Sequence, residues 1–329
     1  MNDMHETIAK GREVVRIEAG AVASLESRIG ESFGRAVDLI LNCSGRVVIT
    51  GVGKSGIIAR KIVATLNSTG TPSMFLHPSD AVHGDLGMVR SDDVVVCISK
   101  SGDTPELNSL LPLFKRIGIP IISLVGRMRS KLALESTLVL DASVQEEACP
   151  HDLAPTSSTT VTLVLGDALA VALLERRKFR KEDFAFYHPG GTLGKRLLLK
   201  VDEMMAAGNA VPSVRGNVHL RDAIMEMTSK RLGCTCVVRE DGTLDGILTD
   251  GDLRRLLQKG VDIASITADA AMTPHPKTIR RGTLAALALQ EMEAYNITQI
   301  VVVDEDNKPA GVIHLHDLVK AGLGSDETS

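Results

Sequence analysis

The glycine-rich turn Gly51–Gly56 carries the first side chains that could bind a ligand. A β-branched run precedes its three glycines, and an apolar pattern of helical period follows them. This order predicts a strand, a tight turn and a helix. Backbone N–H groups and the positive end of the helix dipole would meet at the turn, where an anion can bind beside Lys54 and Ser55.

Several interpretations of this turn compete. Its glycine spacing matches the dinucleotide pattern G-x-G-x-x-G, but that pattern expects an acidic residue about twenty positions on, and the next apolar run ends in His77. A Walker loop would need a glycine where Val48 stands. A phosphate monoester held by Lys54 and Ser55 remains, beside the simpler interpretation that the turn only closes strand onto helix.

A second hydroxyl-rich turn begins at Ser99 and opens another helix near Pro105. Ser99, Ser101 and Thr104 can donate hydrogen bonds to phosphate oxygens, together with the backbone N–H groups at the helix start. Alternatively, Ser101 or Thr104 only caps the helix. Two such turns in one sheet favour a shared phosphate.

Groups that can move a proton stand in three further segments. The stretch His77–Asp85 holds two histidines and two aspartates, which suit a metal or acid/base site, although a polar loop with satisfied side chains is commoner. Glu147 follows a predicted strand beside a proline-broken loop, a position suited to a general base. His188 ends a short segment and could reach a site in its own subunit or the next.

Five short apolar runs, alternating with helix-like segments, must position these groups. The alternation predicts an α/β fold with a doubly wound parallel sheet, preceded by one or two helices in residues 3–42. In such sheets ligands bind beyond the carboxyl ends of the strands, so the loops after Thr50, Leu76, Ser99 and Asp141 should converge on one crevice. The predicted strands are Arg46–Thr50, Ser73–Leu76, Val94–Ser99, Pro120–Val125 and Leu138–Asp141.

The composition narrows the kind of partner. The chain has 329 residues, enough for two or three domains, with 44% hydrophobic and 24% charged residues. A net charge of -4 and only 2% aromatic residues argue against nucleic acid as the main partner. No secretory signal pattern and no apolar run of membrane-spanning length is present, and the five scattered cysteines suit reduced thiols. We therefore expect a cytoplasmic protein with no membrane partner.

The last part of the chain repeats itself. The segments that end at Asp252 and Asp317 align with an offset of about 65 residues, and each runs from an apolar strand through an acidic turn into a helix. Two small α/β modules that stack on each other are expected. The predicted domains are 1–200, 201–262 and 267–325.

Several motifs together carry a resemblance to known families. Residues 35–175 resemble the sugar isomerase domain family, and residues 203–320 resemble a tandem pair of CBS domains. The whole chain resembles the D-arabinose 5-phosphate isomerases. The motifs are Gly51-Val-Gly-Lys-Ser-Gly, Ser99-Lys-Ser-Gly-Asp-Thr, Ser73-Met-Phe-Leu-His-Pro-Ser-Asp-Ala-Val-His-Gly-Asp-Leu-Gly, Glu147-Ala-Cys-Pro, Leu153-Ala-Pro-Thr-Ser-Ser-Thr and His188-Pro-Gly-Gly.

The resemblance implies reversible interconversion of D-arabinose 5-phosphate and D-ribulose 5-phosphate, the first step towards the Kdo sugar of lipopolysaccharide. It implies no required cofactor, a homotetramer and a bound zinc at His77 that inhibits. The catalytic residues that it implies are Lys54, Glu106, Glu147 and His188. The expected substrate-binding residues are Ser55, Gly70, Thr71, His83, Ser99, Ser101 and Thr104, with Ser109–Gly118 and Ser143–Gln145 nearby.

The reaction assigns roles to these residues. Isomerisation needs ring opening, removal of the C2 proton, an enediol and reprotonation at C1. A carboxylate or imidazole with a pKa moved towards neutrality could carry that proton. We expect Glu147 as the base, Lys54 as the partner of the enediolate or the phosphate, and His188 as the ring-opening acid. Glu106 could instead be the base or position Lys54, and the sequence does not choose between the two carboxylates.

The CBS repeats differ at their expected nucleotide site. CBS modules that bind adenosine ligands commonly use a hydroxyl residue followed three positions later by Asp, as Thr249 and Asp252 do. In the second repeat His314 replaces the hydroxyl and Asp317 is kept. A nucleotide or nucleotide-sugar effector is one expectation, and a purely stabilising role in a dimer or tetramer is the other.

The sequence is also compatible with two other functions. Sugar isomerase domains also serve as sensors of sugar phosphates, but a sensor has no use for the set Lys54, Glu106, Glu147 and His188. An isomerase of another sugar phosphate is harder to exclude, because the shape of the pocket sets that choice.

Overall fold

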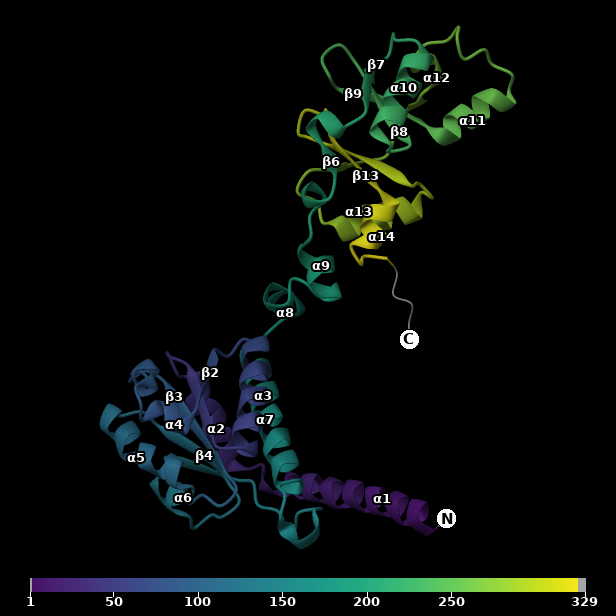
Figure 1. Ribbon diagram of the computed structural model, residues 1–329. Coiled ribbons are helices and arrows are strands. Elements are labelled where there is room, and N and C mark those ends of the chain that lie inside the picture. The colour runs from purple at the N-terminus through teal and green to yellow at the C-terminus, as the bar shows by residue number, and fades with distance from the viewer. Residues whose placement is uncertain (1, 325–329) are drawn as a thin grey trace. The chain divides into compact units, whose positions relative to one another are not determined.

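The structure, a computed structural model, describes residues 2–324 and divides into two compact units between Phe184 and Ala185. The predicted domain limits at residues 1 and 325 lie outside the described residues. The predicted limits at 200, 262 and 267 stay predictions. Each unit has its own sheets and core, and each is described by itself (Figure 1).

The first unit is built on a five-stranded parallel sheet in the order β2-β1-β3-β4-β5. All five predicted strands are present, which confirms the predicted doubly wound fold, and their limits shift by at most one residue. Their bounds are β1 (Val47–Gly51), β2 (Ser73–Leu76), β3 (Val94–Ser99), β4 (Ile121–Val125) and β5 (Leu138–Asp141).

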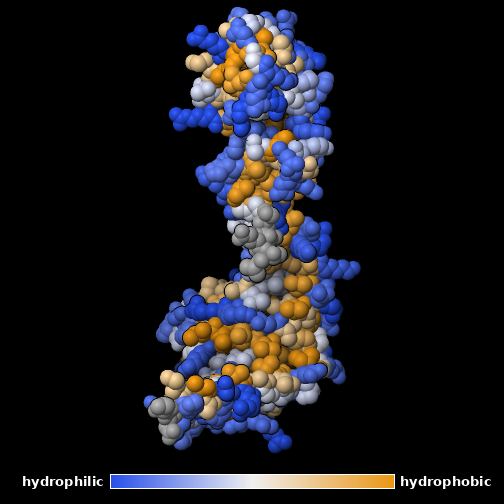
Figure 2. Space-filling view, turned by 90° about the vertical axis from the view of Figure 1, so that its right-hand side faces the viewer, coloured by the Kyte–Doolittle hydropathy of each residue, from blue (hydrophilic) through white to orange (hydrophobic). Residues whose placement is uncertain are grey.

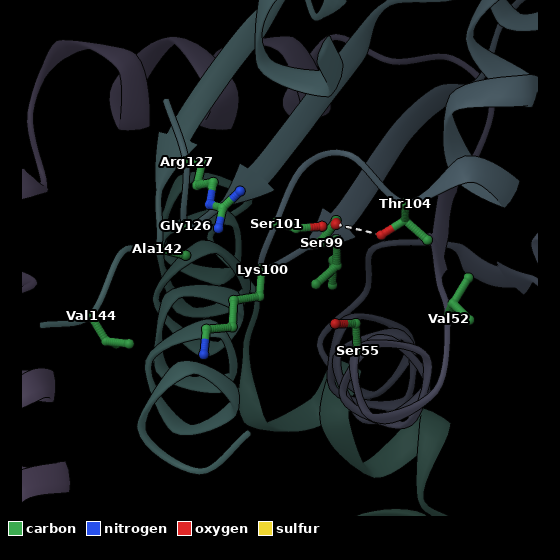
Figure 3. A pocket seen from close by; sticks show the side chains of 11 residues that line it. Val52, Ser55, Ser99, Lys100, Ser101, Thr104, Gly126, Arg127, Ala142 and Val144 are labelled. Carbon is green, nitrogen blue, oxygen red and sulfur yellow. Dashed lines mark hydrogen bonds between the residues drawn. The ribbon is translucent and has the colours of Figure 1, made fainter. Parts of the chain in front are cut away.

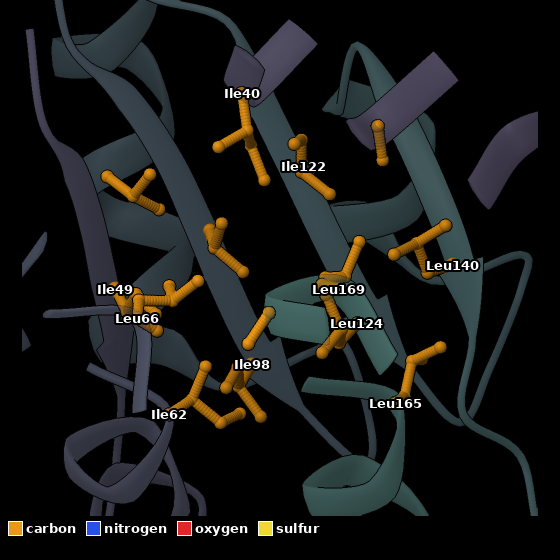
Figure 4. Packing of buried hydrophobic residues seen from close by; sticks show 14 of the residues in the cluster. Ile40, Ile49, Ile62, Leu66, Ile98, Ile122, Leu124, Leu140, Leu165 and Leu169 are labelled. Carbon is orange, nitrogen blue, oxygen red and sulfur yellow. The ribbon is translucent and has the colours of Figure 1, made fainter. Parts of the chain in front are cut away.

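Helices cover both faces of this sheet because alternate strand residues point to opposite sides. Val47 and Ile49 belong to the core that includes residues of α2, α3 and α7, whereas Val48 belongs to the core that includes residues of α4, α5 and α6. Figure 4 shows the first of these two cores. The helices are α1 (Asn2–Ala23), η1 (Glu26–Arg28), α2 (Glu31–Leu41), α3 (Lys54–Ser68), α4 (Pro78–Ala81), η2 (Asp85–Met88), α5 (Pro105–Ile117), α6 (Lys131–Glu135), η3 (Pro150–Asp152) and α7 (Ser157–Arg176).

Helix α7 is the central helix of this core. By length and composition it is the one helix of residues 2–324 that could cross a membrane, yet nine of its residues are buried in the unit. Gly166 faces Ile62 of α3 so closely that a Cβ atom there would overlap the isoleucine side chain. The apolar character of α7 is therefore accounted for by helix packing.

The second unit holds two four-stranded sheets, one for each predicted repeat. The repeats exchange short strands, because β10 (Thr273–Pro274) pairs with β9 (Leu244–Thr249), and β6 (Ala206–Ala207) pairs with β13 (Pro309–His314). The other elements are α8 (Lys181–Tyr187, at the division), α9 (Thr192–Leu198), η4 (Val201–Glu203), η5 (Gly208–Ala210), β7 (Ser213–Arg215), α10 (Leu220–Lys230), β8 (Cys234–Val238), α11 (Asp250–Gln258), α12 (Ala268–Ala271), β11 (Thr278–Arg280), α13 (Ala285–Ala294), β12 (Gln299–Val303) and α14 (Leu315–Lys320).

Each exchanged strand is preceded by a methionine that packs on a glycine of the strand with which it pairs. Met205 lies over Gly311, and Met272 lies over Gly246, in both cases where a Cβ atom would overlap the methionine. We expect Gly311→Ala to destabilise the second unit by about 1–3 kcal/mol through overpacking. Gly34→Ala is the opposite control, because this helical glycine has open space and alanine should stabilise by about 0.5–1 kcal/mol. Thermal unfolding followed by circular dichroism measures both, and equal shifts would contradict the packing argument.

Candidate active site

The glycine-rich turn has the predicted strand, turn and helix geometry. Gly51 ends β1, and Gly53 has a φ of 58°, a backbone conformation that favours glycine. A Cβ atom on Gly56 would lie 2.7 Å from the carbonyl oxygen of Gly51, so only glycine allows α3 to begin this close to the strand. The first turn of α3 thereby presents Ser55 at the carboxyl edge of the sheet.

The turn after β3 presents its hydroxyl groups at the same edge. Ser99 Oγ lies 2.8 Å from Thr104 Oγ1 and accepts a hydrogen bond from the backbone N–H of Gly102 at 2.9 Å. Thr104 occupies the cap position of α5, but its side chain makes no capping hydrogen bond. The alternative in which Thr104 caps the helix is thus not what the structure shows, and the hydroxyl is held towards Ser99.

The two turns share a cavity of about 390 Å³. Four predicted residues line it, and Lys100 and Arg127 add positive charge (Figure 3). No carboxylate is among the described residues that line it, so the cavity suits a small anion. The lining residues are Val52, Ser55, Ile98, Ser99, Lys100, Ser101, Thr104, Gly126, Arg127, Ala142 and Val144.

Glu147 lies on the loop between β5 and α7 and pairs with Lys100, which lines the cavity; its own side chain is fully buried. Its Oε2 accepts hydrogen bonds from the backbone N–H groups of Thr156 (2.8 Å) and Ser158 (3.1 Å) and from Thr156 Oγ1 (3.2 Å). Its Oε1 lies 2.5 Å from both Ser158 Oγ and Lys100 Nζ. The start of α7 therefore holds the carboxylate in one orientation.

These contacts decide the protonation state of Glu147. Burial raises the pKa of the carboxyl group, but hydrogen bonds from Lys100, Ser158 and Thr156 outweigh burial and lower the pKa to about 2. The expectation of a catalytic carboxylate shifted towards neutrality is therefore wrong for Glu147 in this state of the protein. The sequence could not show it, because the lysine and the hydroxyl donors come from other segments.

Because the pKa of Glu147 is lowered, the free energy of unfolding should depend on pH in the acid range. The ionised form of Glu147 contributes stability that is complete above its ordinary pKa of 4.5 and is lost as the pH falls to about 2. Its loss should cost about 3 kcal/mol of unfolding free energy across that window. Urea unfolding of the native protein and Glu147→Gln at pH 5 and pH 3 measures the upper part of this window, in which the native protein should lose about 2 kcal/mol more than the variant. An equal fall in both proteins would show that Glu147 contributes nothing to it.

The remaining predicted site residues do not line the cavity. Lys54 and Glu106 are exposed in the first turns of α3 and α5, and His83 is exposed between α4 and η2. Gly70 and Thr71 precede β2, at the amino edge of the sheet, where Thr71 is buried and accepts a hydrogen bond from Arg177. His188 belongs to the second unit. Their predicted roles stay predictions.

His77, the expected zinc ligand, caps the short helix α4. Its Nδ1 accepts a hydrogen bond from the backbone N–H of Ser79 at 3.3 Å. Within residues 2–324 no group of three or more His, Cys, Asp or Glu side chains is arranged to hold a metal ion. His77 is therefore not part of such a group, and the zinc site at His77 stays a prediction.

The predicted nucleotide residues of the first CBS repeat form a helix cap. Thr249 Oγ1 lies 2.6 Å from Asp252 Oδ2, and Arg255 and Thr273 contact the other oxygen of Asp252. Thr249 and Asp252 also line a cavity of about 610 Å³ between the repeats, with basic residues that include Lys277. In the second repeat His314 Nδ1 accepts a hydrogen bond from the backbone N–H of His316 at 3.1 Å, and so caps α14 in place of a hydroxyl.

Comparison with known proteins identifies the domain families of the two units. The model of the SIS domain family matches residues 40–172, and that of the CBS domain family matches residues 201–259 and 264–324. The fold and the anion cavity thus define a SIS domain protein with a C-terminal CBS pair.

Individual relatives define the family more closely. The chain is 54% identical to the arabinose 5-phosphate isomerase KdsD of Pseudomonas aeruginosa over 323 residues, 98% of this chain and 99% of the relative. It is 48% identical to that of Escherichia coli K12 over 313 residues, 95% of each chain. A solved E. coli CFT073 protein in complex with arabinose 5-phosphate is 45% identical, has a TM-score of 0.54, and covers 56% of this chain and 98% of its own. The chain belongs to the arabinose 5-phosphate isomerase family.

Proposed function

We propose that the protein interconverts D-arabinose 5-phosphate and D-ribulose 5-phosphate. The observation that carries the proposal is a cationic, hydroxyl-lined cavity whose Lys100 pairs with the buried carboxylate of Glu147, in a chain that matches named isomerases over nearly its whole length. The solved relative in complex with arabinose 5-phosphate supports a five-carbon sugar phosphate as the ligand.

The cavity suggests how the phosphate binds. Ser55, Ser99, Ser101 and Thr104 supply hydroxyl donors, and Lys100 and Arg127 supply charge. Donors that are fixed before the ligand arrives lose little freedom on binding. The sugar chain would then extend from the phosphate towards the charged and acid/base groups at the same edge of the sheet.

The proton transfers need one base and one charge partner. Removal of the C2 proton by a carboxylate leaves the electron pair as a C1=C2 double bond while the C1 carbonyl oxygen becomes negative. A proton then passes from the C2 hydroxyl to the C1 oxygen. The carboxylic acid exchanges its proton with solvent and then protonates C1, which gives the ketose. We assign the base to Glu147, with Glu106 as the competing carboxylate, and place Lys54 at the enediolate or the phosphate. His188 is proposed as the acid that opens the ring.

The assay is direct. The purified protein is incubated with a panel of pentose and hexose phosphates, and interconversion is followed by NMR. Turnover of D-arabinose 5-phosphate well above the others supports the proposal. Turnover of another sugar phosphate would favour a different isomerase, and no turnover of any would favour a sugar-phosphate sensor.

The cellular role follows from membership in the family. We propose that the product supplies Kdo for lipopolysaccharide, that the protein works in the cytoplasm, and that it is a homotetramer. Size-exclusion chromatography with light scattering tests the tetramer.

A nucleotide or nucleotide sugar is proposed as the ligand of the cavity of about 610 Å³ between the CBS repeats, where Lys277 and Arg255 supply charge for phosphates.

The reaction needs no metal, so removal of metal should not lower activity. We expect EDTA to leave the rate unchanged or raise it, and added Zn²⁺ to inhibit through His77. His77→Ala should raise the zinc concentration needed for half inhibition by about tenfold or more, as expected when a liganding side chain is lost. His5→Ala is the control, because His5 is exposed on α1. Loss of activity in EDTA that Zn²⁺ restores would contradict this proposal.

A further inference from the structure

Lys100 faces the anion cavity and also pairs with Glu147, a combination to which the proposed mechanism gives no role. Its side chain lines the anion cavity, and its ammonium group lies 2.5 Å from Glu147 Oε1. The lysine side chain is 44% exposed, whereas that of Glu147 has no exposed surface. Lys100 therefore contacts both the cavity and a buried carboxylate that does not itself line the cavity.

In this arrangement Glu147 has no free oxygen with which to accept a proton from carbon. Thr156 and Ser158 bind Oε2, and Ser158 and Lys100 bind Oε1. The backbone N–H groups of Thr156 and Ser158 at the start of α7 are fixed by the chain, and their two hydroxyl donors sit on short side chains of the same segment. Lys100 is the one partner on a long flexible stem that also faces the cavity, so its movement would uncover the carboxylate at least cost.

The cavity supplies a reason for Lys100 to move. Its described lining carries Lys100, Arg127 and hydroxyl groups but no carboxylate, so a bound phosphate dianion would compete with Glu147 for the ammonium group. The ammonium group has three donors and can turn about its stem without moving the backbone. The Lys100 carbonyl oxygen accepts a hydrogen bond from Gly126 N at 3.1 Å, which anchors the backbone during that turn.

We propose that Lys100 is a positioning residue that blocks Glu147 in the free protein and transfers its ammonium group to the substrate phosphate on binding. The inference rests on the proposed isomerase function and adds a way in which the remote phosphate activates the base. Without Lys100 the pKa of Glu147 would rise, since burial remains and one strong opposing hydrogen bond is gone. A freed Glu147 is both more accessible and more basic.

The test separates the phosphate from the sugar. Exchange of the C2 deuterium of D-arabinose, which has no phosphate, is followed by NMR with and without inorganic phosphate. In the native protein added phosphate should accelerate this exchange by roughly tenfold or more, the effect of one charge-assisted hydrogen bond. Lys100→Met should exchange D-arabinose faster than the native protein, and phosphate should add nothing.

Two further variants complete the design. Lys100→Arg keeps the charge and should keep activation by phosphate, which guards against a misfolded Lys100→Met. Lys61→Met is the matched control, because it removes another lysine–carboxylate pair of 2.5 Å, with Asp167, outside the cavity. It should leave both rates unchanged.

Specific results would overturn the inference. An absence of phosphate activation in the native protein would do so, and so would a Lys100→Met protein that is equally slow with and without phosphate. The native protein is first assayed with D-arabinose 5-phosphate. If it turns over that substrate and the Lys100 pattern is absent, only the inference fails, whereas absent turnover would defeat the isomerase proposal itself.

Discussion

Glu147→Gln should lower kcat for the interconversion by about 10²–10⁴-fold, the usual contribution of a general base. Glutamine keeps the size of the side chain and can still accept hydrogen bonds from Thr156 and Ser158, so the loop before α7 should keep its shape. What is lost is the group that takes the C2 proton. The measurement is the loss of deuterium from C2-labelled D-arabinose 5-phosphate together with the rate of ketose formation.

Two carboxamide variants make that result specific. Glu146→Gln removes a neighbouring exposed carboxylate and should retain native rates. Glu106→Gln tests the competing carboxylate at the start of α5. If Glu147→Gln still exchanges deuterium while Glu106→Gln does not, the base is Glu106 and the role of Glu147 is to hold Lys100.

Arg127→Met should raise KM for D-arabinose 5-phosphate by about tenfold to a hundredfold, with a much smaller change in kcat. The guanidinium group lies on the loop after β4 and points into the cavity in Figure 3, so it can bind the phosphate in both the ground state and the transition state. A charge-assisted hydrogen bond of this kind accounts for the size of the effect. A substitution that weakens binding of the ground state and the transition state equally raises KM and leaves kcat unchanged.

The same variant should bind inorganic phosphate more weakly, as measured by calorimetry, with little change in melting temperature, because Arg127 is an exposed residue. Arg129→Met is the matched control, since Arg129 is exposed on the same loop and does not line the cavity. Equal effects of the two substitutions would mean that the charge of the loop, and not a contact in the cavity, attracts the substrate.

Much of the fold could be predicted from local pattern. The strands of the parallel sheet are short β-branched runs buried on both faces, so their limits follow from composition and from the glycine or hydroxyl turns that end them. The turns at Gly51 and Ser99 were placed at one edge because all parallel strands end there. The exchange of β6 and β10 between the repeats could not be predicted, since two-residue strands carry no periodicity.

The site was harder to predict than the fold. Ser55, Ser99, Ser101 and Thr104 follow strands directly and were found, but Arg127 was missed. Ligands bind beyond the carboxyl ends of parallel strands, and this rule also applies to β4, which ends at Val125. Arg127 is the second residue after that end. The pair of Lys100 and Glu147 has no local signal, because the two residues meet only when the loop after β5 folds back over the turn after β3.

The interpretation of Glu147 shows the limit most clearly. Position at the end of a strand predicted a base, and burial alone would have raised its pKa. The contacts from Lys100 and the start of α7 reverse that shift. Residue type and position therefore predicted that the carboxylate matters, while its state in the free protein depends on tertiary contacts.

The most direct test of the account is incubation of the native protein with D-arabinose 5-phosphate in D₂O, with EDTA present. We predict that ribulose 5-phosphate forms at equilibrium with arabinose 5-phosphate and that deuterium enters C1 of the ketose, because the proton on the catalytic carboxylic acid exchanges with solvent at the enediol stage. Absence of conversion, or conversion in which the C2 hydrogen moves to C1 with no deuterium entering from solvent, would contradict it.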